Sequence, residues 1–83
     1  MEKDVRNIKY DEAIEGLMTQ LFRYRLEGLV PSPCERWEAI FENLKLCHEW
    51  LQQLEAGSGD IRWWEQIEEG IRVAQEDLKA WEA

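Results

Sequence analysis

The sequence has little of what secreted folds and membrane spans require. Its 83 residues include two cysteines and two prolines, which is too few for a disulfide framework. Its longest uncharged stretches, such as 16–22, are much shorter than the roughly 20 apolar residues of a membrane-spanning helix. No apolar run follows residues 1–4, so we expect no secretory signal. These absences favour a cytoplasmic protein that does not contact membranes.

The chain also lacks an excess of basic residues. It has 18 Asp and Glu against 10 Lys and Arg, for a net charge of −8. A protein that binds the nucleic-acid backbone needs clustered lysines and arginines to displace counterions. We therefore expect no direct binding to nucleic acid, and a basic protein partner or simple solubility explains the charge better. The acidity is concentrated in residues 31–83, while residues 1–30 are close to neutral.

The abundant residues favour helices, and two turns divide them into three segments. Glycine, proline and serine gather at 28–33 and at 57–60. Between these turns, side chains suited to a core recur at alternating intervals of three and four residues, which places them on one side of a helix. These seam positions are Tyr10, Ile14, Leu17, Leu21, Tyr24 and Gly28, then Trp37, Ile40, Leu44, Cys47, Leu51 and Leu54, then Trp64, Ile67, Ile71, Ala74, Leu78 and Trp81.

We predict an all-α fold in which residues 1–83 form a single domain. Three seams of equal length joined by short turns indicate an antiparallel up-down-up three-helix bundle, with helices at about 8–28, 33–55 and 61–82. We expect residues 1–7 to be frayed, and we find no internal repeat.

Residues that start and stop helices follow the same division. Ser32 and Glu35 form a capping box, with Pro33 at the first helical position. Asp60 is the expected N-cap of the third helix. Gly28 should end the first helix, and we expect its missing side chain to make room for indoles of the neighbouring helices.

Carboxylate pairs at helical spacing are the first candidates for chemistry. Glu35 with Glu38, and Glu65 with Glu68, form E-x-x-E pairs of a kind that can share a magnesium ion. Helical nucleoside-triphosphate pyrophosphohydrolases follow such a pair with E-x-x-D, which is missing here. The seam assignment also turns these carboxylates outward, so we expect a solvated acidic face and neither a metal nor a cofactor. This face comprises Glu38, Glu42, Glu65, Glu69 and Glu76.

His48 and the two cysteines complete the set of reactive side chains. His48 flanks the second seam without a nucleophile or acid in a triad relation to it, so we expect no catalytic residue. Cys34 and Cys47 lie 13 residues apart in one predicted helix, or roughly 20 Å, which is too far for a disulfide. Cys47 is expected in the core. Cys34 lies in a first helical turn, where thiols can be reactive, and an ordinary role there is the alternative.

Two groups of residues outside the seams are candidate partner contacts. The first helix has a second apolar series accompanied by two arginines. We expect Phe22, Leu26 and Leu29 to lie away from the seam, where only another chain could cover them. Trp50 and Trp63 flank the other seams, and a wide core explains them as well as a partner does. The candidate partner-binding residues are Met18, Phe22, Arg23, Arg25, Leu26, Leu29, Trp50 and Trp63.

These observations favour a small acidic protein-interaction module without enzymatic activity. We expect an inhibitor or adaptor that binds a larger protein through an apolar and aromatic helix face, with a homodimer as one form of that contact. A second hypothesis is an acidic mimic of nucleic acid, because phage-encoded inhibitors, anti-CRISPR proteins among them, include small acidic helical proteins; this analogy rests on size and charge alone. The third is a small-ligand-binding oligomer lined by Tyr10 and Tyr24, and the fourth is a magnesium-dependent phosphohydrolase.

Overall fold

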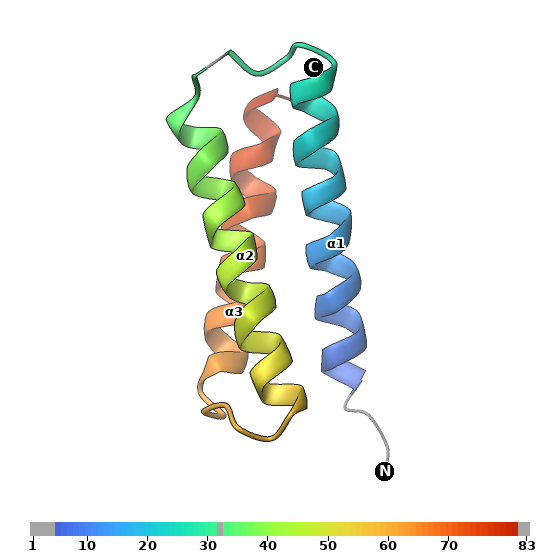
Figure 1. The fold of residues 1–83 in the computed structure, drawn as a ribbon, viewed down its shortest axis with the longest axis vertical. Coiled ribbons are helices and arrows are strands. Elements are labelled where there is room, and N and C mark those ends of the chain that lie inside the picture. The colour runs from blue at the N-terminus through green and yellow to red at the C-terminus, as the bar shows by residue number, and fades with distance from the viewer. Residues whose placement is uncertain (1–4, 32, 82–83) are drawn as a thin grey trace.

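Three helices account for most of the chain. The computed structural model describes residues 5–31 and 33–81, with side chains from residue 7 onward. Its helices are α1 (Val5–Leu26), α2 (Glu35–Glu55) and α3 (Trp63–Leu78), and a short 3-10 turn, η1 (Lys79–Trp81), follows α3. Successive helices run antiparallel and pack against one another (Figure 1), which confirms the predicted up-down-up bundle. Of the described helices, none is long and apolar enough to cross a membrane.

The core consists of the predicted seams. In the described part of the chain, every buried apolar residue except Val30 occupies a seam position. These buried seam residues are Ile14, Leu17 and Leu21 of α1, Trp37, Ile40, Leu44, Cys47 and Leu51 of α2, and Ile67, Ile71, Ala74 and Leu78 of α3. Seam residues near the helix ends, such as Tyr10 and Trp81, are half-buried. The three-four spacing therefore predicted which side of each helix packs inward.

Both inter-helix turns begin with a glycine in the left-handed region. Gly28 has φ 79° and Gly57 has φ 81°. The N–H of Gly28 donates to the carbonyl of Arg25 at 3.2 Å, and the N–H of Leu29 donates to that of Tyr24 at 3.0 Å, as in a glycine C-cap. A Cβ at Gly28 would meet nothing within 4 Å. The prediction that this glycine makes room for neighbouring indoles is therefore wrong, because the helix has already ended there.

Two of the helices begin later than predicted. Cys34 is the N-cap of α2 and has extended backbone (φ −133°, ψ 107°), so Pro33 lies before the helix. Ser32, the predicted cap, is outside the described residues. Before α3, Asp60 accepts hydrogen bonds from the guanidinium and the backbone N–H of Arg62, both at 2.9 Å, and they hold the pKa of Asp60 below its usual range. Asp60 thus caps a turn that precedes α3 rather than the helix itself.

The outer helix ends also differ from prediction. α1 begins at Val5, so the expected fraying of residues 1–7 is wrong for residues 5–7, while residues 1–4 lie outside the described part. α1 ends at Leu26, and α3 ends at Leu78, after which η1 continues the chain to Trp81.

α2 and α3 share several residues at equivalent positions, a likeness that the sequence prediction of no internal repeat did not include. When Trp37 is aligned with Trp64, several further pairs along the two helices are identical. These pairs are Glu38 and Glu65, Ile40 and Ile67, Glu42 and Glu69, Glu49 and Glu76, and Leu51 and Leu78. The helices are antiparallel, and the equivalent residues Asn43 and Gly70 meet across them, with the Asn43 amide donating to the Gly70 carbonyl at 2.9 Å. Equivalent positions of the two antiparallel helices therefore meet at this contact.

The closest described approach of a glycine to another helix lies at the same place. A Cβ on Gly70 would lie 2.5 Å from the Cys47 sulfur and 3.2 Å from the Asn43 side-chain oxygen. A real Cβ cannot lie so close to a buried sulfur, so glycine permits the spacing of the two helices. Burial also raises the pKa of the Cys47 thiol, which favours its neutral form.

Candidate functional site

An aromatic cluster covers the junction of α1 and α2. Phe22 of α1 meets Trp37 and Phe41 of α2 edge-to-face, with ring centroids 5.2 and 5.4 Å apart. The rings of Trp37 and Phe41 are stacked at 5.6 Å. These geometries are the favoured ones for aromatic pairs. Through this cluster, Phe22 of α1 packs against the seam residue Trp37 and its neighbour Phe41 on α2.

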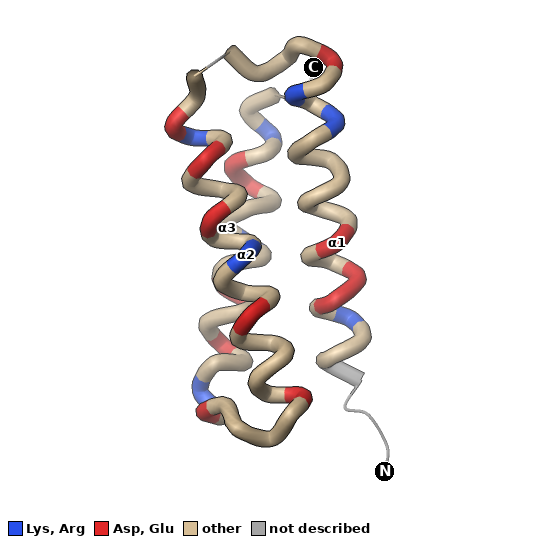
Figure 2. Tube along the Cα trace, in the orientation of Figure 1, with Lys and Arg blue, Asp and Glu red and all other residues tan. Residues whose placement is uncertain are grey.

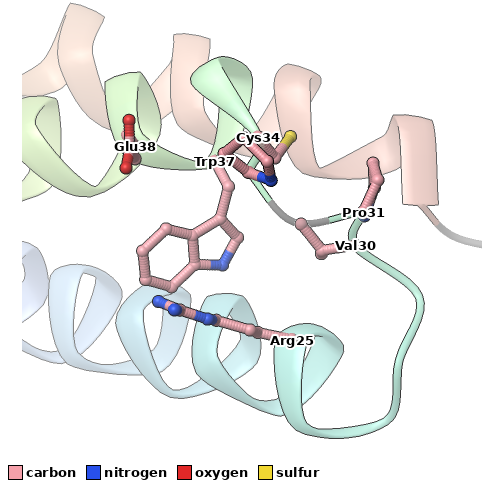
Figure 3. Close-up of a pocket in the computed structure, with 7 residues that line it drawn as sticks. Arg25, Val30, Pro31, Cys34, Trp37 and Glu38 are labelled. Atoms are coloured by element: carbon pink, nitrogen blue, oxygen red, sulfur yellow. The ribbon is translucent and has the colours of Figure 1, made fainter.

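Trp37 anchors this cluster to the core. Its indole N–H donates to the Leu21 carbonyl at 2.8 Å, and the residue is only 6% exposed. The Arg25 guanidinium lies 4.7 Å from the centre of the indole ring, and the Lys45 ammonium lies 5.6 Å from that of Phe41. Figure 3 shows the Arg25 side chain extended along one face of the indole. Both cations are held where the ring electrons attract them.

The second apolar series of α1 is exposed at the three positions that the sequence placed away from the seam, Phe22, Leu26 and Leu29. Met18 is half-buried, and Phe22, at 41% exposure, meets the two rings of α2. The rings of α2 thus contact one side of Phe22, and the rest of its side chain stays in solvent. Leu26 and Leu29 remain open, at 87% and 49% exposure.

We call Phe22, Leu26 and Leu29 the α1 patch. Phe22 and Leu26 lie one helical turn apart, and Leu29 follows in the turn after the helix. Arg23 and Arg25 occupy the last turn of α1, where their positive charges interact favourably with the negative end of the helix dipole. Arg23 pairs with Glu27 at 3.2 Å, whereas Arg25 makes no ion pair with the residues that the structure describes. The patch therefore combines exposed leucines with an unneutralised guanidinium.

A small cavity of about 90 Å³ lies beneath the turn between α1 and α2. Val30 and Cys34 line it together with Arg25 and Trp37 (Figure 3). Val30 is the buried residue that the seam pattern did not predict, because it packs from the turn rather than from a helix. Cys34 and Cys47 are both free thiols, as the spacing predicted, and Cys34 is half-buried. Whether Cys34 is reactive stays a hypothesis.

Trp50 and Trp63 form a second aromatic contact, between α2 and α3. Their rings are stacked with centroids 5.6 Å apart and an interplanar angle of 22°. Both residues are half-buried, so each ring covers one side of the other and keeps an outer side in solvent. This pair borders a groove along the outer side of α2 and α3.

This α2–α3 groove is lined by equivalent positions of the two related helices. Its lining residues are Ala39, Ile40, Asn43, Leu46 and Trp50 of α2, and Gln66, Glu69, Gly70, Val73 and Asp77 of α3. Leu46 and Val73, which occupy equivalent positions, are 42% and 38% exposed. α1 packs against both helices of this pair (Figure 1) and contributes no residue to the groove lining. The sequence prediction missed this groove because it depends on the pairing of α2 with α3.

The carboxylates expected on the acidic face do point into solvent. Glu38, Glu42, Glu65, Glu69 and Glu76 are all exposed. In Figure 2 acidic residues recur along α2 and α3, and basic residues lie at the C-terminal end of α1, where the last turn carries Arg23 and Arg25. Within the described ranges, no group of three or more His, Cys, Asp or Glu side chains could hold a metal ion. His48 lies 3.8 Å from the Asp11 carboxylate, between α2 and α1.

The two tyrosines named for a ligand pocket belong to opposite ends of α1. Tyr10 packs against Trp64 with ring centroids 5.9 Å apart and donates to Glu68 at 3.2 Å. Tyr24 accepts a hydrogen bond from the Gln20 amide near the other end. Fourteen residues of helix separate them, or roughly 21 Å, so a shared ligand would need a second copy of the chain.

No family model, curated protein or solved structure matches this chain.

Proposed function

We propose that the protein is a non-enzymatic protein-interaction module, an inhibitor or adaptor, that binds another protein through the α1 patch. The observation that carries the proposal is Leu26, which is 87% exposed although it belongs to an apolar series continuous with the aromatic cluster. Burying a leucine of this kind stabilises a complex by roughly 1.5–3 kcal/mol. An apolar side chain so exposed beside two others is typical of a contact surface.

The charges beside the patch indicate the chemistry of the partner. Arg25 is oriented by the Trp37 ring and has no carboxylate partner among the described residues. In a symmetric dimer through this patch, the same arginines of two copies would come together and repel. The patch therefore fits a different protein, one that presents an apolar pocket with carboxylates at its edge.

Site-specific photo-crosslinking in cells that express the protein tests this proposal. A photoreactive phenylalanine analogue replaces Leu26 in one variant and Gln52, an exposed residue of α2, in the control. We expect a discrete crosslinked protein from position 26 and none from position 52. Equal crosslinking from the two positions, or none from position 26, would contradict the proposal.

Acidic mimicry of nucleic acid is the second candidate, and one observation favours it. Glu38, Glu42 and Glu65 are exposed and make no ion pair with the described residues. A mimic would bind a basic enzyme with an affinity that falls steeply with salt, because exposed charges are screened. Binding through the α1 patch would instead fall on Leu26→Gln and change much less between about 0.05 and about 0.5 M salt, because salt does not screen the burial of apolar surface.

A further inference from the structure

The α2–α3 groove lies between two helices in a position where one more helix could pack. It has a volume of about 340 Å³ and runs between two antiparallel helices. α1 already packs against both helices of this pair. A helix in the groove would complete a four-helix arrangement, with its side chains between those of α2 and α3.

The groove has apolar residues at its centre and is lined by the carboxylates of Glu69 and Asp77, and further acids lie one helical turn from its apolar residues. Leu46 lies between Glu42 and Glu49 at helical spacings of four and three residues, and Val73 lies between Glu69 and Glu76 at the same spacings. Each helix therefore presents one apolar residue between two acids.

Part of this negative charge is unneutralised. Glu69 pairs with Arg72, and Glu76 pairs with Lys79. Asp77, which lines the groove, and Glu42, which lies one helical turn before Leu46, make no ion pair with the described residues. The rim therefore favours a cationic ligand, and the half-exposed leucine and valine favour one with an apolar side.

We infer that the α2–α3 groove binds a cationic amphipathic helix of a partner protein. Apolar side chains of that helix, spaced three and four residues apart, pack against Leu46 and Val73. Lysines or arginines beside them lie near Asp77 and Glu42. This surface is separate from the α1 patch, so the two together would let one small domain bridge two proteins.

A synthetic helix of stated composition tests the inference. The probe is a fluorescein-labelled peptide of 14 residues, with leucine at heptad positions a and d and lysine elsewhere; a second peptide replaces lysine by glutamate. Binding is measured by fluorescence anisotropy with the wild type, with Leu46→Gln/Val73→Gln and with Leu26→Gln. All three changes leave the charge of the protein unaltered, so they report the apolar contact alone.

We expect the lysine peptide to bind and the glutamate peptide not to bind. The groove variant should weaken binding about tenfold or more, as the loss of about 1.4 kcal/mol at a contact would do, and Leu26→Gln should change it less than about twofold. Unchanged binding by the groove variant would show attraction by charge alone and overturn the inference. An equal loss with Leu26→Gln would assign the peptide to the α1 patch, which overturns the groove but not the proposed function.

Amide chemical shifts of the labelled protein provide the second readout. Shifts on adding the lysine peptide should concentrate at Leu46, Gly70 and Val73, and the spectrum of the peptide-free groove variant should show that it is folded. Shifts spread over exposed carboxylates of all three helices would overturn the inference. So would a self-associated wild type that the groove variant converts to a monomer, because the occupant would then be a second copy of this chain.

Discussion

α1 and the α2–α3 pair both bury an apolar seam, but the surfaces that they leave exposed differ. α2 and α3 share one pattern, carry most of the acids and place their extra apolar residues, Leu46 and Val73, inside a shared groove. α1 does not share this pattern, is nearly neutral and leaves Leu26 open at its end. All three helices bury their seams, but the apolar side chains outside the seams lie in different places on α1 and on the α2–α3 pair. Their positions leave two separate surfaces for contact.

The aromatic contacts made by Trp37 and by Trp50 differ in burial. Replacing these two residues should give the largest effect on stability. Trp37 is buried and hydrogen-bonded, whereas Trp50 is half-buried and stacked on Trp63. We expect Trp37→Ala to cost about 3–5 kcal/mol of unfolding free energy, and Trp50→Ala to cost roughly half as much because much of its surface stays in water. Urea unfolding followed by circular dichroism measures both. Equal losses would mean that the two contacts contribute alike.

α1 and α3 each contain a glycine, and the space around the two glycines differs. A Cβ at Gly70 would press on the Cys47 sulfur at 2.5 Å, whereas a Cβ at Gly16 would meet nothing within 4 Å. Overpacking of this kind costs about 1–3 kcal/mol, so Gly70→Ala should lower the unfolding free energy despite a better helix propensity. Gly16→Ala should raise it by about 1 kcal/mol. Thermal unfolding of the two variants would show shifts of opposite sign, and a stabilised Gly70→Ala would refute the close approach.

A third comparison separates the covered and open ends of the α1 patch. Phe22 packs on two rings of α2, and Leu26 packs on little. Phe22→Asp should therefore destabilise the fold by about 1–3 kcal/mol, whereas Leu26→Asp should stay within about 0.5 kcal/mol of the wild type. The same urea titration measures both. A large loss for Leu26→Asp would show that this leucine belongs to the core.

The smallest effect concerns the turn between α2 and α3. Hydrogen bonds from Arg62 lower the pKa of Asp60, so the folded state binds the proton less readily than the unfolded chain does. The stabilisation is then complete above the unfolded pKa, about 3.9, and is lost as pH falls through the lowered folded value. Asp60→Asn should have a smaller decrease in melting temperature than the wild type over that acidic range. An unchanged acid dependence would show that these bonds do not stabilise the turn.

The bundle was largely predictable because its seams follow helix periodicity, a property of each segment alone. All three helices and nearly every buried residue, Leu44 and Ile67 for example, were derived from spacing. Helix starts were less accurate, because Cys34 and Asp60 adopt turn geometries that depend on their neighbours.

The candidate surfaces were predicted less well, for a physical reason. Phe22 contacts Trp37 and Phe41 of another helix, and the helical pattern of α1 alone could not show these ring contacts. The groove at Leu46 and Val73 likewise needs the antiparallel pairing of two helices. The related sequences of α2 and α3 were a signal that could have revealed it. Leu26, whose surroundings are solvent, was placed correctly by periodicity.

The solution mass of the free protein, measured by light scattering, tests most directly whether the α1 patch is open to a different protein. At about 100 μM, a concentration at which a contact with a Kd near 1 μM, or about −8.2 kcal/mol, would be saturated, we expect a monomer for the wild type and for Leu26→Asp alike. A wild-type dimer that Leu26→Asp converts to a folded monomer would contradict this expectation. The patch would then be a self-association surface, and only the α2–α3 groove would remain for a partner.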